Sequence, residues 1–197
     1  MTTLRRSVLN NGGDMNYYGS KELAASFRTV RNNTIKIAED IPESKYEFRP
    51  APDTRTVAQS LTHIALSTRF QQRLQTSKVS DLATVNFPDF YKDMVTEEAK
   101  PRTKSDIIAL LKSEGDSYAA FLEGLSEAFL AESVKMSPQG GGGTKTRFEM
   151  LLGPKEHEMH HRAQLMTIQR LIGQVPHLTR QMQDRMAQAN AGQQAQR

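Results

Sequence analysis

The chain has 197 residues, of which 37% are hydrophobic and 24% charged, a composition typical of one globular domain. It contains no cysteine, which excludes disulfides, thiolate metal sites and a cysteine nucleophile and makes a reducing cytoplasm the expected location. The formal net charge of +4 is spread along the chain and the apolar runs are short, so we expect no nucleic-acid partner and no membrane partner.

Residues 1–14 are expected to be a disordered leader, because Gly12 and Gly13 stand just before Met15. A Gly-Gly pair can be encoded by a purine-rich stretch that resembles a bacterial ribosome-binding site, so Met15 is a candidate start in place of Met1. We expect the folded domain to span residues 15–175, followed by a C-terminal part at 176–197.

The first predicted helix covers residues 21–41, with Ser20 as its N-cap and Pro42 ending it. Apolar and small side chains recur at steps of three and four residues, which is one face of an amphipathic helix. These positions are Leu23, Phe27, Val30, Thr34, Ile37 and Ile41. The proline-containing segment that follows is predicted to be an extended loop carrying Tyr46 and Phe48.

A second helix is predicted from Thr56, where Gln59 completes a capping box. Its side chains form two apolar stripes on opposite sides, Val57, Leu61, Ile64 and Ala65 on one and His63, Leu66 and Phe70 on the other. Both sides must be covered, one by the core and the other by a pocket or a partner subunit. We therefore expect a homodimer.

Residues 78–102 have no sustained periodicity and are predicted to be a long connection with one short helix near 90–99. The third helix is predicted at 105–125. Glycines 140–143 predict a flexible loop, because the strand and the Lys-Ser/Thr pair that a phosphate-binding loop requires are missing.

The fourth helix is predicted from Thr146, where Glu149 completes another capping box, and Gly153 and Pro154 should kink or restart it. A short last helix is predicted within 176–189, with residues 190–197 disordered. No segment alternates like a strand. The sequence thus predicts an all-α protein, a four-helix bundle with a long connection between its second and third helices.

Two histidines on the fourth helix, His157 and His161, lie four residues apart on its inner face, which also carries Gln164, Leu165, Ile168, Leu171 and Ile172. With His63 on the second helix they form a set of three imidazoles that can hold one divalent ion and leave open positions. The alternative is a group of core histidines that form hydrogen bonds with other helices. His160 is offset from this face, which favours a surface or supporting role over metal binding.

The segment from His157 to His161 also matches the H-E-x-x-H signature of zinc peptidases. A longer peptidase motif would need ligands at positions occupied by Gln164 and Thr167, and no glutamate follows Glu158. We interpret the match as accidental.

"VAQSLTHIA", a long interval and "HEMHHRAQLMTIQRLIG" resemble the DinB/YfiT-like superfamily of metal-dependent four-helix bundles, over about residues 17–173. The resemblance implies that His63, His157 and His161 are the metal ligands. Two positions depart from the family pattern. Ala163 replaces a usual glycine, and Thr54-Arg55 replaces an aromatic residue before the second helix.

The resemblance also implies a function. A histidine-only site suits zinc, nickel, iron or manganese, which would act as a Lewis acid or lower the pKa of water or a thiol. Related families suggest an S-transferase that joins a low-molecular-weight thiol cosubstrate to a small electrophile, and in a chain without cysteine this thiol must come from outside. The alternatives are a metal-binding or stress-related protein without turnover and, less favoured, a zinc hydrolase or peptidase.

The catalytic residues are not identified. Glu158 points away from the ligand face, and Glu149 and Glu156 are expected to be solvated. Tyr46 and Phe48, together with Leu66 and Phe70, are predicted to make a partly apolar cavity above the metal, which favours a small-molecule substrate. The alternative is that Leu66 and Phe70 only fill the core.

Overall fold

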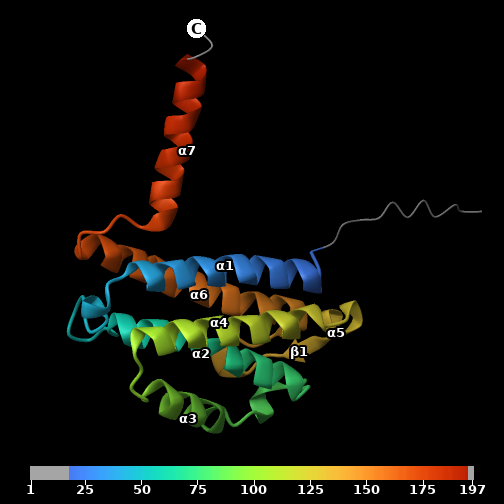
Figure 1. Ribbon diagram of the computed structural model, residues 1–197. Helices are drawn as coiled ribbons and strands as arrows, with labels where there is room; N and C mark the ends of the chain where they lie inside the picture. Colours follow the sequence, from blue (N-terminus) through green and yellow to red (C-terminus); the bar gives the residue numbers. More distant parts are fainter. Residues whose placement is uncertain (1–17, 195–197) are drawn as a thin grey trace, which may run out of the picture.

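The computed structural model describes residues 18–194, which form mainly helices (Figure 1). The four long helices are α1 (Ser20–Asp40), α2 (Val57–Thr76), α4 (Lys104–Glu123) and α6 (Arg147–Leu171). The shorter elements are η1 (Glu43–Lys45), η2 (Leu82–Thr84), α3 (Phe87–Glu98), α5 (Glu127–Ala131), β1 (Ser133–Lys135), η3 (Pro138–Gly140), β2 (Thr144–Thr146) and α7 (His177–Gln194). The predicted leader and both candidate starts lie outside the described residues.

The long helices form one bundle, as predicted. Helix α1 packs against α4 and α6, and α2 packs against the same two helices (Figure 1). The first two helices in the sequence are therefore diagonal partners in the bundle, and α4 and α6 fill the two positions between them. This arrangement places α2 beside α6, the two helices that carry the predicted metal ligands.

Local sequence signals set most helix boundaries. The Gln59 backbone N–H donates to Thr56 Oγ1 at 3.1 Å and the Thr56 N–H donates to Gln59 Oε1 at 2.9 Å, which confirms the predicted capping box. Glu149 and Thr146 form the same box before α6. At α1 the cap is Gly19 rather than Ser20, because Glu22 accepts the Gly19 N–H at 3.0 Å and Ser20 is already helical.

Helix α6 continues through Pro154 and does not restart there, contrary to one of the two predicted outcomes. A proline removes one helical hydrogen bond, and packing on neighbouring elements can hold the rest of the helix in place. The inner face of α6 is buried at Leu165 and Ile168, whereas Leu171 is 61% exposed although it was predicted to face inward. Leu171 is the last residue of α6.

The glycine loop is part of a β-hairpin, which the sequence did not predict because no segment alternates like a strand. Strands β1 and β2 pair antiparallel, with Val134 opposite Lys145. Gly141, Gly142 and Gly143 all have positive φ, which glycine adopts without steric cost and which closes the connection. Strands of three residues are too short to produce a recognisable alternation in the sequence.

The long connection between α2 and α4 carries η2 and α3 and covers the second stripe of α2. The Phe70 ring stacks on Tyr91, with ring centroids 5.1 Å apart, and on Phe87 at 6.1 Å. Helix α3 begins three residues before its predicted start, with Pro88 in its first turn. The stripe that suggested a partner subunit is thus covered within the chain.

The C-terminal helix α7 is longer than predicted, since residues 190–194 are helical rather than disordered. It projects from the end of the bundle (Figure 1) and is attached at its base. There the Arg180 guanidinium pairs with Asp40 at 2.7 Å, and the ring of buried His177 lies 3.2 Å from Asn33 Oδ1.

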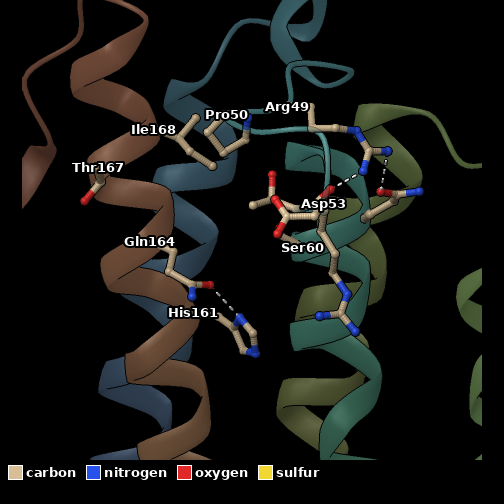
Figure 2. Close-up of a pocket in the computed structure, with 11 residues that line it drawn as sticks. Arg49, Pro50, Asp53, Ser60, His161, Gln164, Thr167 and Ile168 are labelled. Atoms are coloured by element: carbon tan, nitrogen blue, oxygen red, sulfur yellow. Dashed lines mark hydrogen bonds between the residues drawn. The ribbon is translucent and has the colours of Figure 1, made fainter.

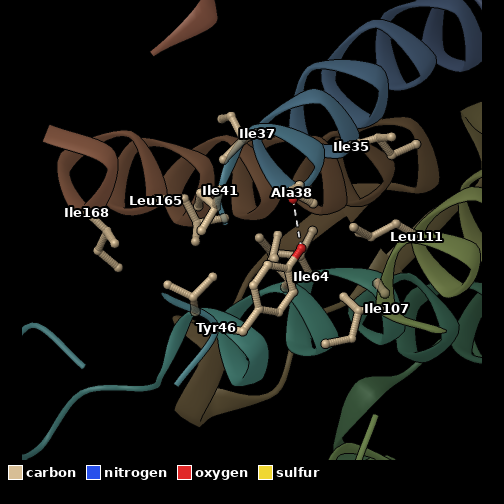
Figure 3. Close-up of a cluster of buried hydrophobic side chains, with 13 residues drawn as sticks. Ile35, Ile37, Ala38, Ile41, Tyr46, Ile64, Ile107, Leu111, Leu165 and Ile168 are labelled. Atoms are coloured by element: carbon tan, nitrogen blue, oxygen red, sulfur yellow. Dashed lines mark hydrogen bonds between the residues drawn. The ribbon is translucent and has the colours of Figure 1, made fainter. Parts of the chain in front are cut away.

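One large apolar cluster lies where α1, α2, α4 and α6 meet (Figure 3). Tyr46 belongs to this cluster, because it is 4% exposed and its hydroxyl donates to the Ala38 carbonyl at 2.8 Å. Further buried members are Ile37, Ile41, Val57, Leu61, Ile64, Ile107, Leu111, Leu165 and Ile168. No helix within residues 18–194 is both long and apolar enough to cross a membrane.

Candidate metal centre

The structure brings the three predicted ligands together between α2 and α6. His63 lies on α2, and His157 and His161 lie one turn apart on α6. His157 Nε2 is 3.2 Å from His63 Nε2 and 3.2 Å from His161 Nε2. Each residue offers one ring nitrogen, and these three nitrogens lie within 4.8 Å of one another. Such a geometry can hold a metal ion.

Two side-chain oxygens determine how the outer imidazoles are protonated. His63 Nδ1–H donates to Glu98 Oε1 at 2.7 Å, and His161 Nδ1–H donates to Gln164 Oε1 at 2.9 Å. A neutral imidazole carries one proton, so the Nε2 atoms of His63 and His161 are left with free lone pairs. Both lone pairs face the ring of His157.

His157 cannot satisfy both neighbours by hydrogen bonding. Its Nε2 carries at most one proton and can donate to only one of the two facing nitrogens. Its Nδ1 is buried and has no hydrogen-bond partner among the described residues. A cation between the rings would accept all three Nε2 lone pairs. Two nitrogen ligands about 2.0–2.1 Å from a tetrahedral ion lie roughly 3.3 Å apart, close to the 3.2 Å that separates His157 Nε2 from each of its two neighbours.

The electrostatics keep the imidazoles available to a cation. Burial, followed by the nearby imidazoles of His161, His63 and His160 and the Arg55 guanidinium, lowers the pKa of His157 to about 4. Burial also lowers the pKa of His161. His157 and His161 are therefore neutral at pH 7, as a metal ligand must be.

Glu98 is the functional residue that the sequence did not reveal. It is the last residue of α3, in the long connection, and its carboxylate reaches His63 from outside the bundle. Burial alone raises the pKa of Glu98, but the hydrogen bond from His63 and nearby positive charges outweigh it and hold this pKa below its usual value. The sequence signal was only a predicted short helix ending in two acidic residues, Glu97 and Glu98. Which of them faces His63 depends on how α3 packs.

The supporting groups continue beyond the first hydrogen bonds. The Gln164 oxygen accepts a hydrogen bond from His161. The Gln164 amide nitrogen donates to His160 Nε2 at 3.1 Å. His160 is exposed and takes no part in the central cluster. Its contact is with Gln164 at the edge of the centre and not with the three clustered histidines.

Glu158 would be the general base if the H-E-x-x-H match indicated a peptidase. It lies in the core and not beside the histidines. Its carboxylate accepts from Arg31 Nε at 3.0 and 3.1 Å, and both side chains are almost fully buried. Arg31 also donates to the carbonyls of Leu111 and Ile64. This buried ion pair ties α1, α2, α4 and α6 together, and it leaves Glu158 pointing away from the histidines, as predicted. Glu149 and Glu156 are exposed.

The cavity beside the centre is more polar than predicted. Tyr46 and Phe48 do not line it, because both pack in or against the main apolar cluster. A cavity of about 700 Å³ instead opens beside His161 and Gln164 (Figure 2). The loop before α2 and the start of α2 form its other wall, with Arg49, Pro50, Asp53, Thr54, Arg55, Gln59 and Ser60.

Leu66 and Phe70, the other two residues of the predicted apolar wall, lie in different surroundings. Leu66 is fully buried, as in the alternative that it fills the core. Phe70 lines a second cavity of about 330 Å³ under α3, together with His63 and His157.

The fold and this centre define a class, a helical bundle in which three histidines from two adjacent helices can hold a metal ion. The chain belongs to the DinB superfamily, whose family profile matches residues 26–165. The resemblance inferred from the sequence is thereby confirmed.

The chain is similar to two proteins of Bacillus subtilis. It is 24% identical to YjoA, an uncharacterised protein, over 155 residues that cover 78% of this chain and 91% of YjoA. The crystal structure of YjoA, described as a DinB-like protein, has a TM-score of 0.59 at 21% identity and covers 78% of this chain and 94% of YjoA. The structure of YfiT, described as "a probable metal-dependent hydrolase with an unusual four-helix bundle topology", has a TM-score of 0.59 at 17% identity, covering 88% and 94% of the two chains.

Proposed function

We propose that the protein binds one divalent metal ion through Nε2 of His63, His157 and His161 and catalyses a reaction of a small molecule there. The observation that carries the proposal is the convergence of Nε2 lone pairs that His157 cannot satisfy by donating a proton. Three protein ligands leave at least one position open, which is the pattern of catalytic rather than structural zinc sites. Zinc, nickel, iron and manganese all suit such a donor set.

A metal at this position would supply Lewis acidity and lower the pKa of a water or thiol. The residues of the chain orient the site. Glu98 holds the His63 ring in the tautomer that directs Nε2 inward, and Gln164 does the same for His161. Both partners therefore act as positioning residues.

The polar cavity beside His161 supports a cosubstrate that carries an anionic group. Arg49 is held by the Thr54 carbonyl and Gln59 Oε1. Arg55 has no hydrogen bond or ion pair among the residues that the structure describes, and its charge acts on His157, His161 and Glu98. A free guanidinium beside the centre suits a carboxylate of a polar ligand.

Thiol transfer is the reaction we favour. Because the chain has no cysteine, the sulfur nucleophile must be a separate low-molecular-weight thiol, and the cavity with Arg55 has room for a charged one. The thiol would lose its proton to water and its sulfur would form a bond to an electrophilic carbon. The leaving group would depart from that carbon with the electron pair of the broken bond. Hydrolysis, in which water takes the place of the thiol, is the second candidate, favoured by the similarity to YfiT and its description.

Metal analysis tests the site. We expect the purified protein to hold about one equivalent of divalent metal and the His63→Ala, His157→Ala and His161→Ala variants to lose it. His160→Ala is the matched control, because His160 is exposed and outside the cluster, and it should keep its metal. Circular dichroism should show that all four variants stay helical, since the apolar cluster of the bundle contains none of these histidines. Stoichiometric metal in all three ligand variants would disprove the site.

The nucleophile is tested separately. Metal-loaded protein is incubated with a small electrophile, with and without a low-molecular-weight thiol, and the products are separated by mass. Thiol adducts that depend on the metal support transfer, whereas thiol-independent turnover to the hydrolysed product supports the hydrolase. No metal-dependent product from any pair would leave the non-catalytic alternative as the better account.

A further inference from the structure

The polar cavity and the cavity under α3 lie on the two sides of the histidines, between α2 and α6. Along α2, Ser60 lines the polar cavity, His63 belongs to the centre, and Ser67 lines the cavity beyond. Along α6 the order runs in reverse, with Gln164 on the polar side and Pro154 on the other. The candidate metal centre therefore lies between two cavities, and each has at least one of the three histidines in its wall.

The two cavities differ in chemistry. The polar cavity has two arginines and an aspartate in its wall. The cavity under α3 has no Lys, Arg, Asp or Glu among its lining residues, and it holds about 330 Å³. Its wall beside the two histidines is made mainly of aromatic rings, thioethers and a proline ring, from Phe70, Tyr91, Met94, Met150 and Pro154. Such a wall binds apolar groups through buried area and through the adaptable shape of methionine.

The α6 wall of this cavity includes two residues that weaken a helix. Gly153 and Pro154 both have lower helix propensity than other residues. A Cβ atom added at Gly153 would meet no atom within 4 Å, so packing does not require glycine there. Because glycine has no side chain, open space remains next to the centre, one helical turn before His157.

Two polar groups in the wall lack partners. Gln71 is 8% exposed, and its amide nitrogen has no hydrogen-bond acceptor among the described residues. His157 Nδ1 is buried and also unpaired. It carries the ring proton when the lone pair of Nε2 binds a metal ion. Unpaired donors in an apolar wall favour a ligand that brings an acceptor oxygen.

We infer that the cavity under α3 binds a neutral, apolar group of the substrate that carries one acceptor oxygen, such as an aromatic amide, ester or ketone. The inference deepens the proposed function, on which it rests for the adjacent metal. It assigns the polar cosubstrate to the His161 side and the apolar substrate to the side of His63 and His157. The two reactants would then approach the centre from two different cavities.

Methionine methyl groups report directly on this cavity. Protein labelled with ¹³C at its methionine methyls and loaded with zinc, which is diamagnetic, is titrated with benzamide as a neutral probe. We expect saturable shifts of the Met94 and Met150 signals, with a Kd on the order of 1 mM for so small a ligand. Met182 and Met186, exposed on α7, serve as internal references and should not move. Benzamidine has the same shape and a positive charge, and it should bind more weakly because the cavity wall offers it no carboxylate.

A pair of glycine substitutions locates the binding. Gly153→Leu should fold, because leucine has the higher helix propensity and its Cβ has room, and it should abolish the benzamide shifts by filling the cavity. Gly192→Leu is the matched control, since Gly192 is also helical with open space around it but lies on α7, and it should bind benzamide as the wild type does.

Three results would overturn the inference: no response of Met94 and Met150, an unchanged response in Gly153→Leu, or benzamidine binding as tightly as benzamide. Metal content is measured on the same samples. A protein that binds metal but not benzamide refutes the apolar subsite alone, and one that binds benzamide without ever retaining metal refutes the proposed function.

Discussion

At the scale of single residues, the chemistry of the centre depends on side chains outside the group of three histidines. Glu98 and Gln164 each accept a hydrogen bond from one imidazole N–H, and so they decide which nitrogen of His63 and His161 faces inward with a free lone pair. Without such a partner an imidazole can exchange its tautomer and rotate, and its lone pair is then no longer held at the centre.

We predict that Glu98→Ala weakens metal affinity by about 10–100-fold, as is usual when a supporting partner of a histidine ligand is removed. Competition with a chelator of known affinity measures the change. Glu97→Ala is the control, because Glu97 precedes Glu98 on the same helix but pairs with Lys100 and Arg102. Glu98→Gln keeps an acceptor oxygen and should fall between the wild type and Glu98→Ala. Equal affinity for the two alanine variants would contradict the positioning role.

Glu158 gives a second residue-scale prediction, which separates a structural role from a peptidase role. Glu158→Gln leaves the Arg31 charge buried without its counter-ion, so the free energy of unfolding should fall by about 3–5 kcal/mol. Urea unfolding measures this loss, and metal content should stay unchanged. Glu156→Gln, two residues away and exposed, should be neutral. A Glu158→Gln protein of normal stability but without activity would instead indicate a general base.

At the scale of elements, two glycines inside long helices should respond in opposite ways to one extra methyl group. Gly115 on α4 faces Arg31 on α1, and a Cβ there would lie 2.7 Å from Arg31 Cγ. Arg31 cannot move aside easily, because its guanidinium is bound to Glu158 and to two backbone carbonyls. Gly115 therefore allows α1 and α4 to approach closely around a buried charge.

We predict that Gly115→Ala destabilises the protein by about 1–3 kcal/mol through overpacking. Gly153→Ala should instead stabilise it by roughly 0.5–1 kcal/mol, because alanine has the higher helix propensity and its Cβ meets open space. Thermal or urea unfolding of the two variants side by side tests the pair. Two changes of the same sign would show that tertiary contacts do not distinguish these positions.

At the scale of the whole molecule, the homodimer stays a prediction, but the apolar stripe that suggested it is not free. The second stripe of α2 is covered by α3 of the same chain, so a dimer must use another surface. Light scattering at micromolar concentration should give twice the chain mass of 22.1 kDa. A mass near the monomer would disprove the dimer without affecting the centre, whose three histidines belong to one chain.

The sequence alone determined the helical class, the capping boxes at Thr56 and Thr146, and the three histidines. These features are local or periodic. A capping box lies within four residues, and two histidines four apart share a helix face whatever the helix packs against. His63 needed more than spacing, namely its place on a second apolar stripe and the resemblance to a family.

The tertiary structure decided what spacing cannot encode. It selected Glu98 rather than Glu97 as the partner of His63, because that choice depends on how a connecting helix docks on α2. It placed Glu158 in a buried ion pair with Arg31, 127 residues away in the sequence. It also moved Tyr46 into the core and left the loop around Arg55 to form the cavity wall. Each outcome is set by contacts between distant segments, whose free energies depend on burial and geometry that exist only after the helices have packed.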